Sequence, residues 1–253
     1  ARSAPFESNE TGDKTMTPET FHERIHLVID RLGKNAPPHE LFAGGVEDWH
    51  ARARLAHFLA QMPEHRAEAI ELFQSVMDAE VNEELAQDVE EKVYAMQGLS
   101  ALEAEEKETQ EAALEHINLA IECAEGTDFL YKYILRGELW ADRWNLMHKL
   151  GMTEDAEAEA DERIAAFEGL EDAVPHNSYL YYGYRFKAHL AAERGVVLIA
   201  KDYMHMAIHA MEIPPAYEQP LAEAFAQTHE NASWILREID RATPDPAQLH
   251  WDI

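Results

Sequence analysis

The sequence predicts an all-α protein built from repeated pairs of antiparallel helices. Three observations lead to this fold class. Ala, Glu and Leu are abundant, whereas glycine is scarce, with 11 in 253 residues. Apolar residues recur at spacings of three and four, as on one face of a helix. One helical pattern also returns along the chain with a nearly fixed period, which is typical of stacked helical repeats.

The acidic charge of the chain argues against two classes of partner. The sequence has 49 acidic and 21 basic residues, and its formal net charge is −28. Because phosphate backbones and anionic membrane surfaces would be repelled, we expect neither nucleic acid nor a membrane as a partner. A basic protein partner and a solvated acidic surface without a special role both fit this charge.

Three further features predict a cytoplasmic protein. No apolar run approaches the roughly eighteen residues that a membrane helix needs. The first ten residues, ARSAPFESNE, lack the apolar core of a signal peptide. Cys123 is the single cysteine, so the chain forms no internal disulfide, which favours a reducing compartment.

The N-terminal region predicts a flexible arm followed by a helix. Residues 1–16 are polar and form the predicted arm. Thr17 is a natural N-cap, Pro18 suits the first helical position, and Gly33 follows the last residue of the apolar pattern. These signals predict a helix over residues 17–33, at the start of a single helical-repeat domain that covers residues 17–253.

Four segments between about residues 48 and 213 carry the repeat. They align on alanines that lie about 44 residues apart, which are Ala69, Ala113, Ala156 and Ala200. The residues four and eight positions after each alanine are mostly apolar and share one helical face. Gly151 and Gly195 lie five residues before their alanines, where a turn between two helices fits. The four segments therefore predict the second helices of four successive pairs.

This pattern resembles the second helix of a tetratricopeptide repeat, which has a small residue, a bulky one four later and a small one three after that. Trp140 and Tyr184 lie sixteen residues before their alanines, where that family commonly has a large aromatic residue. The resemblance implies a right-handed α-solenoid of antiparallel helix pairs. The chain departs from the family in its period, since the family repeats every 34 residues, and in Arg163, which replaces a small residue. An irregular helical bundle is the alternative.

The C-terminal region predicts a cap for the array. A stack of repeats exposes apolar surface at its last unit unless a further helix covers it. After the break EIPPAYEQP, residues 212–220, the chain again has a helical pattern that includes Phe225, Trp234 and Ile239. We therefore expect capping helices over about residues 216–243.

Residues 22–26 spell H-E-x-x-H, the pattern that places two zinc ligands and a general base on one helix of a metalloprotease. A catalytic zinc also needs a third protein ligand, and apolar residues follow the motif where a metzincin would continue with glycine and histidine. We interpret the motif as a coincidence in an amphipathic helix. A zinc-dependent hydrolase that uses His22, Glu23 and His26 is the alternative function.

The most suggestive surface is aromatic and lies on the first helices of the third and fourth units. In tetratricopeptide proteins the first helices line a concave groove that binds extended peptides, and the resemblance implies the same here. Arg and Tyr are frequent anchors of recognition surfaces. The residues expected to face the groove are Glu138, Asn145, His148, Tyr182, Arg185 and His189. Ordinary packing between repeats is the alternative role of the aromatic residues.

The sequence thus predicts a non-catalytic module that binds an extended segment of a protein or peptide, and a basic segment fits the charge of the chain. A regulator that senses a peptide is a further alternative. We predict no catalytic residue, no cofactor and no metal site. The oligomeric state is left open.

Overall fold

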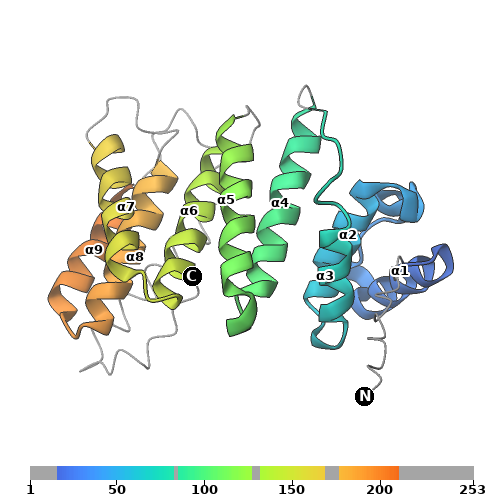
Figure 1. Ribbon diagram of the computed structural model, residues 1–253, viewed down its shortest axis with the longest axis horizontal. Coiled ribbons are helices and arrows are strands. Elements are labelled where there is room, and N and C mark those ends of the chain that lie inside the picture. Colours follow the sequence, from blue (N-terminus) through green and yellow to red (C-terminus); the bar gives the residue numbers. More distant parts are fainter. Residues whose placement is uncertain (1–15, 83–84, 127–131, 169–176, 211–253) are drawn as a thin grey trace, which may run out of the picture. The chain divides into compact units, whose positions relative to one another are not determined.

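The computed structural model describes residues 16–82, 85–126, 132–168 and 177–210. In these four ranges all regular secondary structure is helical and no strand occurs, which confirms the all-α prediction. The α-helices are α1 (Pro18–Leu32), α2 (Trp49–Ala60), α3 (Arg66–Gln74), α4 (Ala86–Glu103), α5 (Gln110–Gly126), α6 (Lys132–Lys149), α7 (Thr153–Phe167), α8 (Asn177–Glu193) and α9 (Val197–Ala210) (Figure 1). None of the described helices combines the length and the apolar character needed to cross a bilayer.

The chain divides into two compact units, Ala1–Val76, which contains α1 to α3, and Met77–Ile253, which contains α4 to α9. The single domain over residues 17–253 stays a prediction. The predicted arm over residues 1–16 lies, except for its last residue, outside the described residues, as do the capping helices predicted over about residues 216–243.

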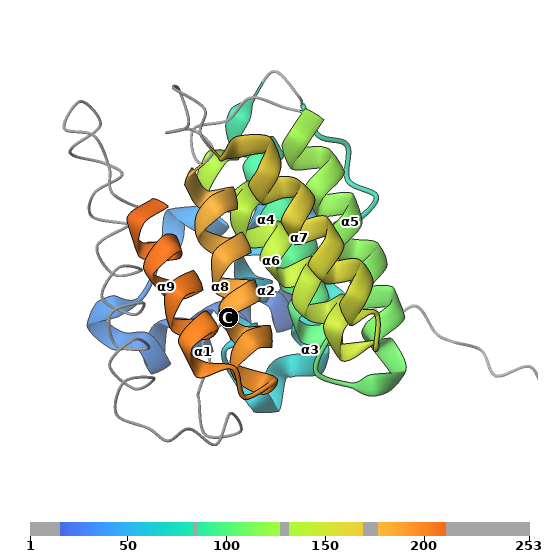
Figure 2. The same ribbon diagram turned by 90° about the vertical axis from the view of Figure 1, so that its left-hand side faces the viewer.

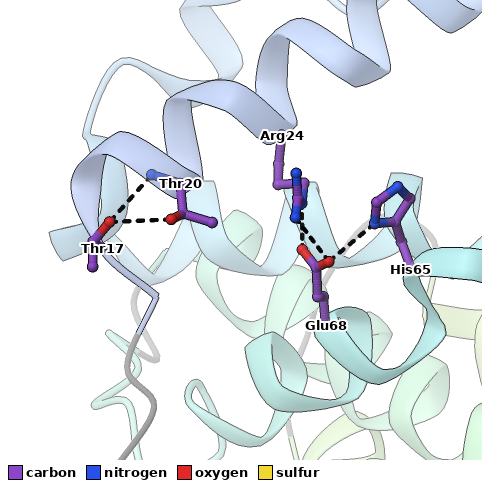
Figure 3. Close-up of polar contacts among 5 residues, drawn as sticks. All are labelled: Thr17, Thr20, Arg24, His65 and Glu68. Atoms are coloured by element: carbon purple, nitrogen blue, oxygen red, sulfur yellow. Dashed lines mark hydrogen bonds and ion pairs between the residues drawn. The ribbon is translucent and has the colours of Figure 1, made fainter.

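Helix α1 begins and ends at the residues that the sequence predicts. The hydroxyl of Thr17 accepts a hydrogen bond from the Thr20 amide at 3.2 Å (Figure 3). Pro18 takes the first helical position, and Gly33 ends the helix with a φ of 53°, a conformation that favours glycine. The apolar face of the helix buries Phe21, Ile25 and Val28.

A bidentate ion pair joins α1 to α3. Both Nε and Nη2 of Arg24 donate to the carboxylate of Glu68, the second of them over 3.0 Å, and His65 Nδ1 lies 3.1 Å from the same carboxylate (Figure 3). The hydrogen bond from Arg24 lowers the pKa of Glu68 below its usual range, and the contact with His65 adds to this shift. Both partners in the ion pair are about a quarter exposed, so water screens it only in part.

We expect Glu68→Gln to lower the free energy of unfolding at pH 7 by about 1 kcal/mol, because the bidentate charged pair is lost. A carboxylate with a depressed pKa in the folded state contributes stability above its ordinary pKa and loses that contribution as the pH falls through the folded-state value. The variant and the parent should therefore converge as the pH falls below the folded-state pKa of Glu68. Urea unfolding from pH 7 downward measures this. Glu71→Gln, at an exposed position of α3, is the matched control, and an equal loss in both variants would contradict the prediction.

The four alanines that align the repeat occupy the same place in four helices, as predicted. Each is the fourth residue of its helix and each is 0% exposed: Ala69 in α3, Ala113 in α5, Ala156 in α7 and Ala200 in α9. Each of these helices packs against the helix that precedes it, so that α2–α3, α4–α5, α6–α7 and α8–α9 form pairs. A methyl group at a buried contact allows the two helices of a pair to lie close together.

In the second unit, each helix from α4 to α8 packs against the next one along the chain, and α6 also lies against α8. Figure 2 shows α8 between α9 and α6. Gly151 and Gly195 lie in the short turns before α7 and α9 with φ values of 82° and 73°. These are the two turns that the sequence predicts.

Arg163, which departs from the tetratricopeptide pattern, contacts an aromatic residue. Its guanidinium carbon lies 3.9 Å from the ring centroid of Trp140, and its Nη1 lies 3.4 Å from Glu125 Oε1. The same carboxylate oxygen accepts a hydrogen bond from Trp140 Nε1 at 3.0 Å. A small residue in place of Arg163 would remove the cation from this arrangement, which joins α5, α6 and α7.

The backbones of α6 and α8 approach closely at Gly137. A Cβ atom at this position would lie 2.6 Å from both the carbonyl carbon and the hydroxyl oxygen of Ser178. Glycine in a helix interior costs about 1 kcal/mol relative to alanine, and here the close approach requires it. The polar side chains of α6 and α8 are brought together by this contact.

We expect Gly137→Ala to destabilise the protein by roughly 1–3 kcal/mol, since overpacking at a backbone contact exceeds the gain in helix propensity. Gly126→Ala is the matched control, because an added methyl group there meets no atom within 4 Å. That variant should be neutral or slightly stabilised. Urea denaturation of both variants checks the prediction, and a neutral Gly137→Ala would show that α6 and α8 do not approach so closely.

Candidate functional site

The six residues predicted to face a groove lie on two helices that contact each other. Glu138, Asn145 and His148 belong to α6, and Tyr182, Arg185 and His189 belong to α8. Five of them fall into two groups, and half-buried Asn145 lies between Glu138 and His148 along α6. We call the groups the carboxylate cluster, which consists of Gln97, Glu138, Asp142, Tyr182 and Arg185, and the histidine cluster, which consists of His148, His189 and Glu193.

The carboxylate cluster draws residues from α4, α6 and α8. Gln97 of α4 donates a hydrogen bond from Nε2 to Asp142 Oδ2 at 2.8 Å, and it also bonds to Glu138. Glu138 and Asp142 lie on one face of α6 because they are four residues apart. One amide side chain therefore contacts two carboxyl groups of the neighbouring helix.

Burial raises the pKa of Asp142 to about 7. The residue as a whole is half-buried, but its carboxyl group lies among protein atoms. The hydrogen bond from Gln97 opposes the shift, and the negative charge of Glu138 adds to it. Burial also raises the pKa of Glu138, against the effects of Gln97 and of the Arg185 charge. Near neutral pH this carboxyl pair therefore carries less than its full negative charge.

Arg185 and Tyr182 complete the carboxylate cluster from α8. Arg185 is only 6% exposed, and its guanidinium carbon lies 5.2 Å and 5.9 Å from the ring centroids of Tyr181 and Tyr182. Burial raises the pKa of Tyr182, so its hydroxyl stays neutral at all ordinary pH values. Arg185 is buried between the packed helices and affects the cluster through its charge. Glu138 and Tyr182 are half-buried, so a ligand can reach them more easily than it can reach Arg185.

The histidine cluster lies where α6 and α8 end. His148 Nε2 is 3.0 Å from Glu193 Oε2, and His189 Nε2 is 3.3 Å from Glu193 Oε1. The two imidazole rings are perpendicular, with centroids 6.0 Å apart. On its other side, His148 Nδ1 lies 2.8 Å from the hydroxyl oxygen of Thr153, the first residue of α7. Burial lowers the pKa of His189, while Glu193 opposes this shift and His148 adds to it.

Sequence reasoning missed Asp142, Glu193 and Gln97. For the two acidic residues a signal exists, because Asp142 follows Glu138 by four positions and Glu193 follows His189 by four. Gln97 lies in a different helix pair and has no local signal. Only the packing of α4 on α6 brings it to the carboxyl groups.

The H-E-x-x-H residues lie on the exposed side of α1. His22, Glu23 and His26 are all exposed, and the Nε2 atoms of the two histidines are 2.9 Å apart. In the described part of the chain, the histidine cluster is the group of three His, Cys, Asp or Glu side chains whose ligand atoms could share one metal ion. Among the described residues, no third His, Cys, Asp or Glu places a ligand atom within 4.8 Å of those of His22 and His26.

Comparison with known proteins identifies no relative. No protein-family model matches the chain, and neither a curated protein nor a solved structure is significantly similar to it. The tetratricopeptide resemblance therefore stays a prediction, and the two clusters are the features that bear on function.

We expect Asp142→Asn to stabilise the protein at pH 8 by up to roughly 2–4 kcal/mol and to have little effect near about pH 4.5. The raised pKa of Asp142 means that the parent loses stability as the pH rises from the ordinary aspartate value to about 7. An asparagine has no charge to bury and can still hydrogen-bond to Gln97. Urea unfolding across this pH range measures the difference.

The control is Asp202→Asn, which removes an exposed carboxylate from α9. This variant should follow the pH profile of the parent. If Asp142→Asn also follows that profile, then Asp142 ionises normally in the folded protein.

Proposed function

We propose that this protein is a non-catalytic interaction module that binds an extended basic segment of a protein or peptide along α4, α6 and α8. The observation that carries the proposal is the carboxylate cluster, to which all three of these helices contribute. Each of the three is the first helix of its pair. A ligand that lies across the cluster would therefore contact three successive pairs.

We further propose that the helix pairs form a right-handed α-solenoid of the tetratricopeptide type. Two observations support this: the equivalent buried alanines of α3, α5, α7 and α9, and the contact between the first helices α6 and α8. In a stack of this kind the first helices of successive pairs share one face, which forms an extended binding surface. The carboxylate cluster would then lie on that face.

The charges of the carboxylate cluster favour a cationic ligand. Removing carboxyl groups from water costs free energy, and apolar side chains of similar volume would pack in the same space at a lower cost. The pKa values of Glu138 and Asp142 stay raised although Arg185 opposes the shift of Glu138, so a lysine or arginine of a partner would add positive charge where it favours both ionised carboxylates. The net charge of −28 would also attract a basic segment over longer distances.

The test is the binding of labelled peptides, measured by fluorescence anisotropy. We expect a peptide that alternates lysine with alanine to bind, and a glutamate–alanine peptide of the same length not to bind. Because the cluster reaches its full negative charge only when Asp142 loses its proton, affinity should be about tenfold weaker at pH 6 than at pH 8. The double variant Glu138→Gln, Asp142→Asn should bind weakly and independently of pH.

A matched control separates this site from general attraction to an acidic protein. Glu162→Gln combined with Asp202→Asn also removes two carboxyl groups, here from exposed positions of α7 and α9. This control should keep the affinity and the pH dependence of the parent. Equal losses in the two double variants would mean that the lysine peptide binds the overall charge, and the proposed site would be rejected.

A further inference from the structure

We propose that His148, His189 and Glu193 bind a divalent transition-metal ion, with Zn²⁺ as the ion that best suits the ligands. The metal site shares no residue with the carboxylate cluster, on which the proposed peptide binding depends, although the sequence predicts that His148 and His189 also face the groove. A bound ion would connect α6 to α8 near the ends of both helices.

The distances between the ligand atoms fit one small ion. One ligand atom from each residue lies within 4.8 Å of the other two. Zinc binds nitrogen and carboxylate oxygen at about 2.0–2.2 Å in a tetrahedral arrangement, which places neighbouring ligand atoms roughly 3.3 Å apart. Glu193 contacts His148 through Oε2 at 3.0 Å and His189 through Oε1 at 3.3 Å, so both imidazoles already lie against its carboxylate. Small side-chain rotations would bring the two nitrogens and one of these oxygens to the spacing that a single ion needs.

The types of ligand select a class of ion. Two imidazole nitrogens and one carboxylate are typical ligands of zinc and of neighbouring transition metals, whereas calcium and magnesium prefer sites made of oxygen alone. Three protein ligands leave a fourth position of a tetrahedral site for water or another ligand. The Glu193 side chain is 41% exposed, so an ion can reach the site from solvent.

The surroundings of His148 favour the ring orientation that metal binding needs. Metal-binding histidines usually bond through their second ring nitrogen to a nearby oxygen, which holds the ring in place. His148 makes such a contact between Nδ1 and the Thr153 hydroxyl, and its Nε2 faces Glu193. On α8, His189 and Glu193 are four residues apart and so project from the same face. Three helices therefore position the site.

The experiment uses the full chain without a histidine tag, freed of metal by a chelator. Zn²⁺ is then added, and binding is followed by calorimetry and by the shift in melting temperature. We expect one equivalent of Zn²⁺ to bind with a dissociation constant of about a micromolar or tighter and to raise the melting temperature. Co²⁺ in place of Zn²⁺ should give the absorption spectrum of a four-coordinate ion.

The variants locate the ion. His148→Ala, His189→Ala and Glu193→Gln should each weaken Zn²⁺ binding at least about tenfold, and Thr153→Ala should weaken it less. Glu193→Gln changes only one atom of a partly exposed side chain, so it remains informative if an alanine variant fails to fold. The control is His22→Ala combined with His26→Ala, which removes a close histidine pair of α1 and should leave the affinity unchanged.

Two results would overturn the proposal. If the parent takes up no stoichiometric Zn²⁺, the three side chains form a hydrogen-bonded group and nothing more. If Zn²⁺ binds but the affinity of Glu193→Gln equals that of the parent, the ion lies elsewhere. Peptide binding is measured in separate experiments on different residues, so neither result affects the carboxylate cluster.

Discussion

The close contact between α6 and α8 is the constraint on which both clusters depend. At Gly137 the backbone of α6 lies so near Ser178 that even a methyl group has no room. Because helix axes usually lie 8–10 Å apart, with the smallest side chains at the closest contacts, this glycine decides how near the two helices come. The carboxylate cluster lies next to the contact, and the histidine cluster lies further along the same two helices.

The second unit combines this tight packing with unusual polarity. Arg185 is almost fully buried, and the carboxyl groups of Glu138 and Asp142 have raised pKa values because they too are removed from water. Such groups rarely improve stability over apolar side chains of the same size. Their positive and negative charges partly compensate each other, since Arg185 lowers the pKa of Glu138. The fold therefore tolerates the cluster, and a gain in stability does not explain it.

Local signals in the sequence were sufficient to predict the ends of α1 and the equivalent positions of the four aligned alanines. Helix α1 begins and ends as predicted, with Thr17 and Pro18 at its start and Gly33 after its last residue. The aligned alanines fall at the same position of four helices. Such features depend on residues within one or two helical turns. Arg163 was predictable as a departure from the family, but its contact with Trp140 of another helix was not.

The candidate site was predictable only in part, because its members come from three helices. The choice of α6 and α8 followed from their aromatic residues, and the structure does place Glu138, Tyr182 and Arg185 together. The burial of Arg185 was not anticipated, although the run YLYYGYRF contained a signal. A helix that is apolar on nearly all sides is usually enclosed by others, and α8 packs against α6, α7 and α9. Periodicity within one helix does not reveal how many neighbours it has.

The environment of Trp140 also gives the second unit an internal optical probe. Its indole ring is stacked by Arg163 of α7 and hydrogen-bonded to Glu125 of α5, so its emission depends on the positions of three helices at once. In the first unit, Trp49 is stacked on the ring of His50 at a centroid distance of 3.8 Å, a quite different surrounding. Trp49 is the single tryptophan of the first unit, so replacing it by phenylalanine would leave only the emission of the second unit. The two halves of the chain could then be followed separately by light as they unfold.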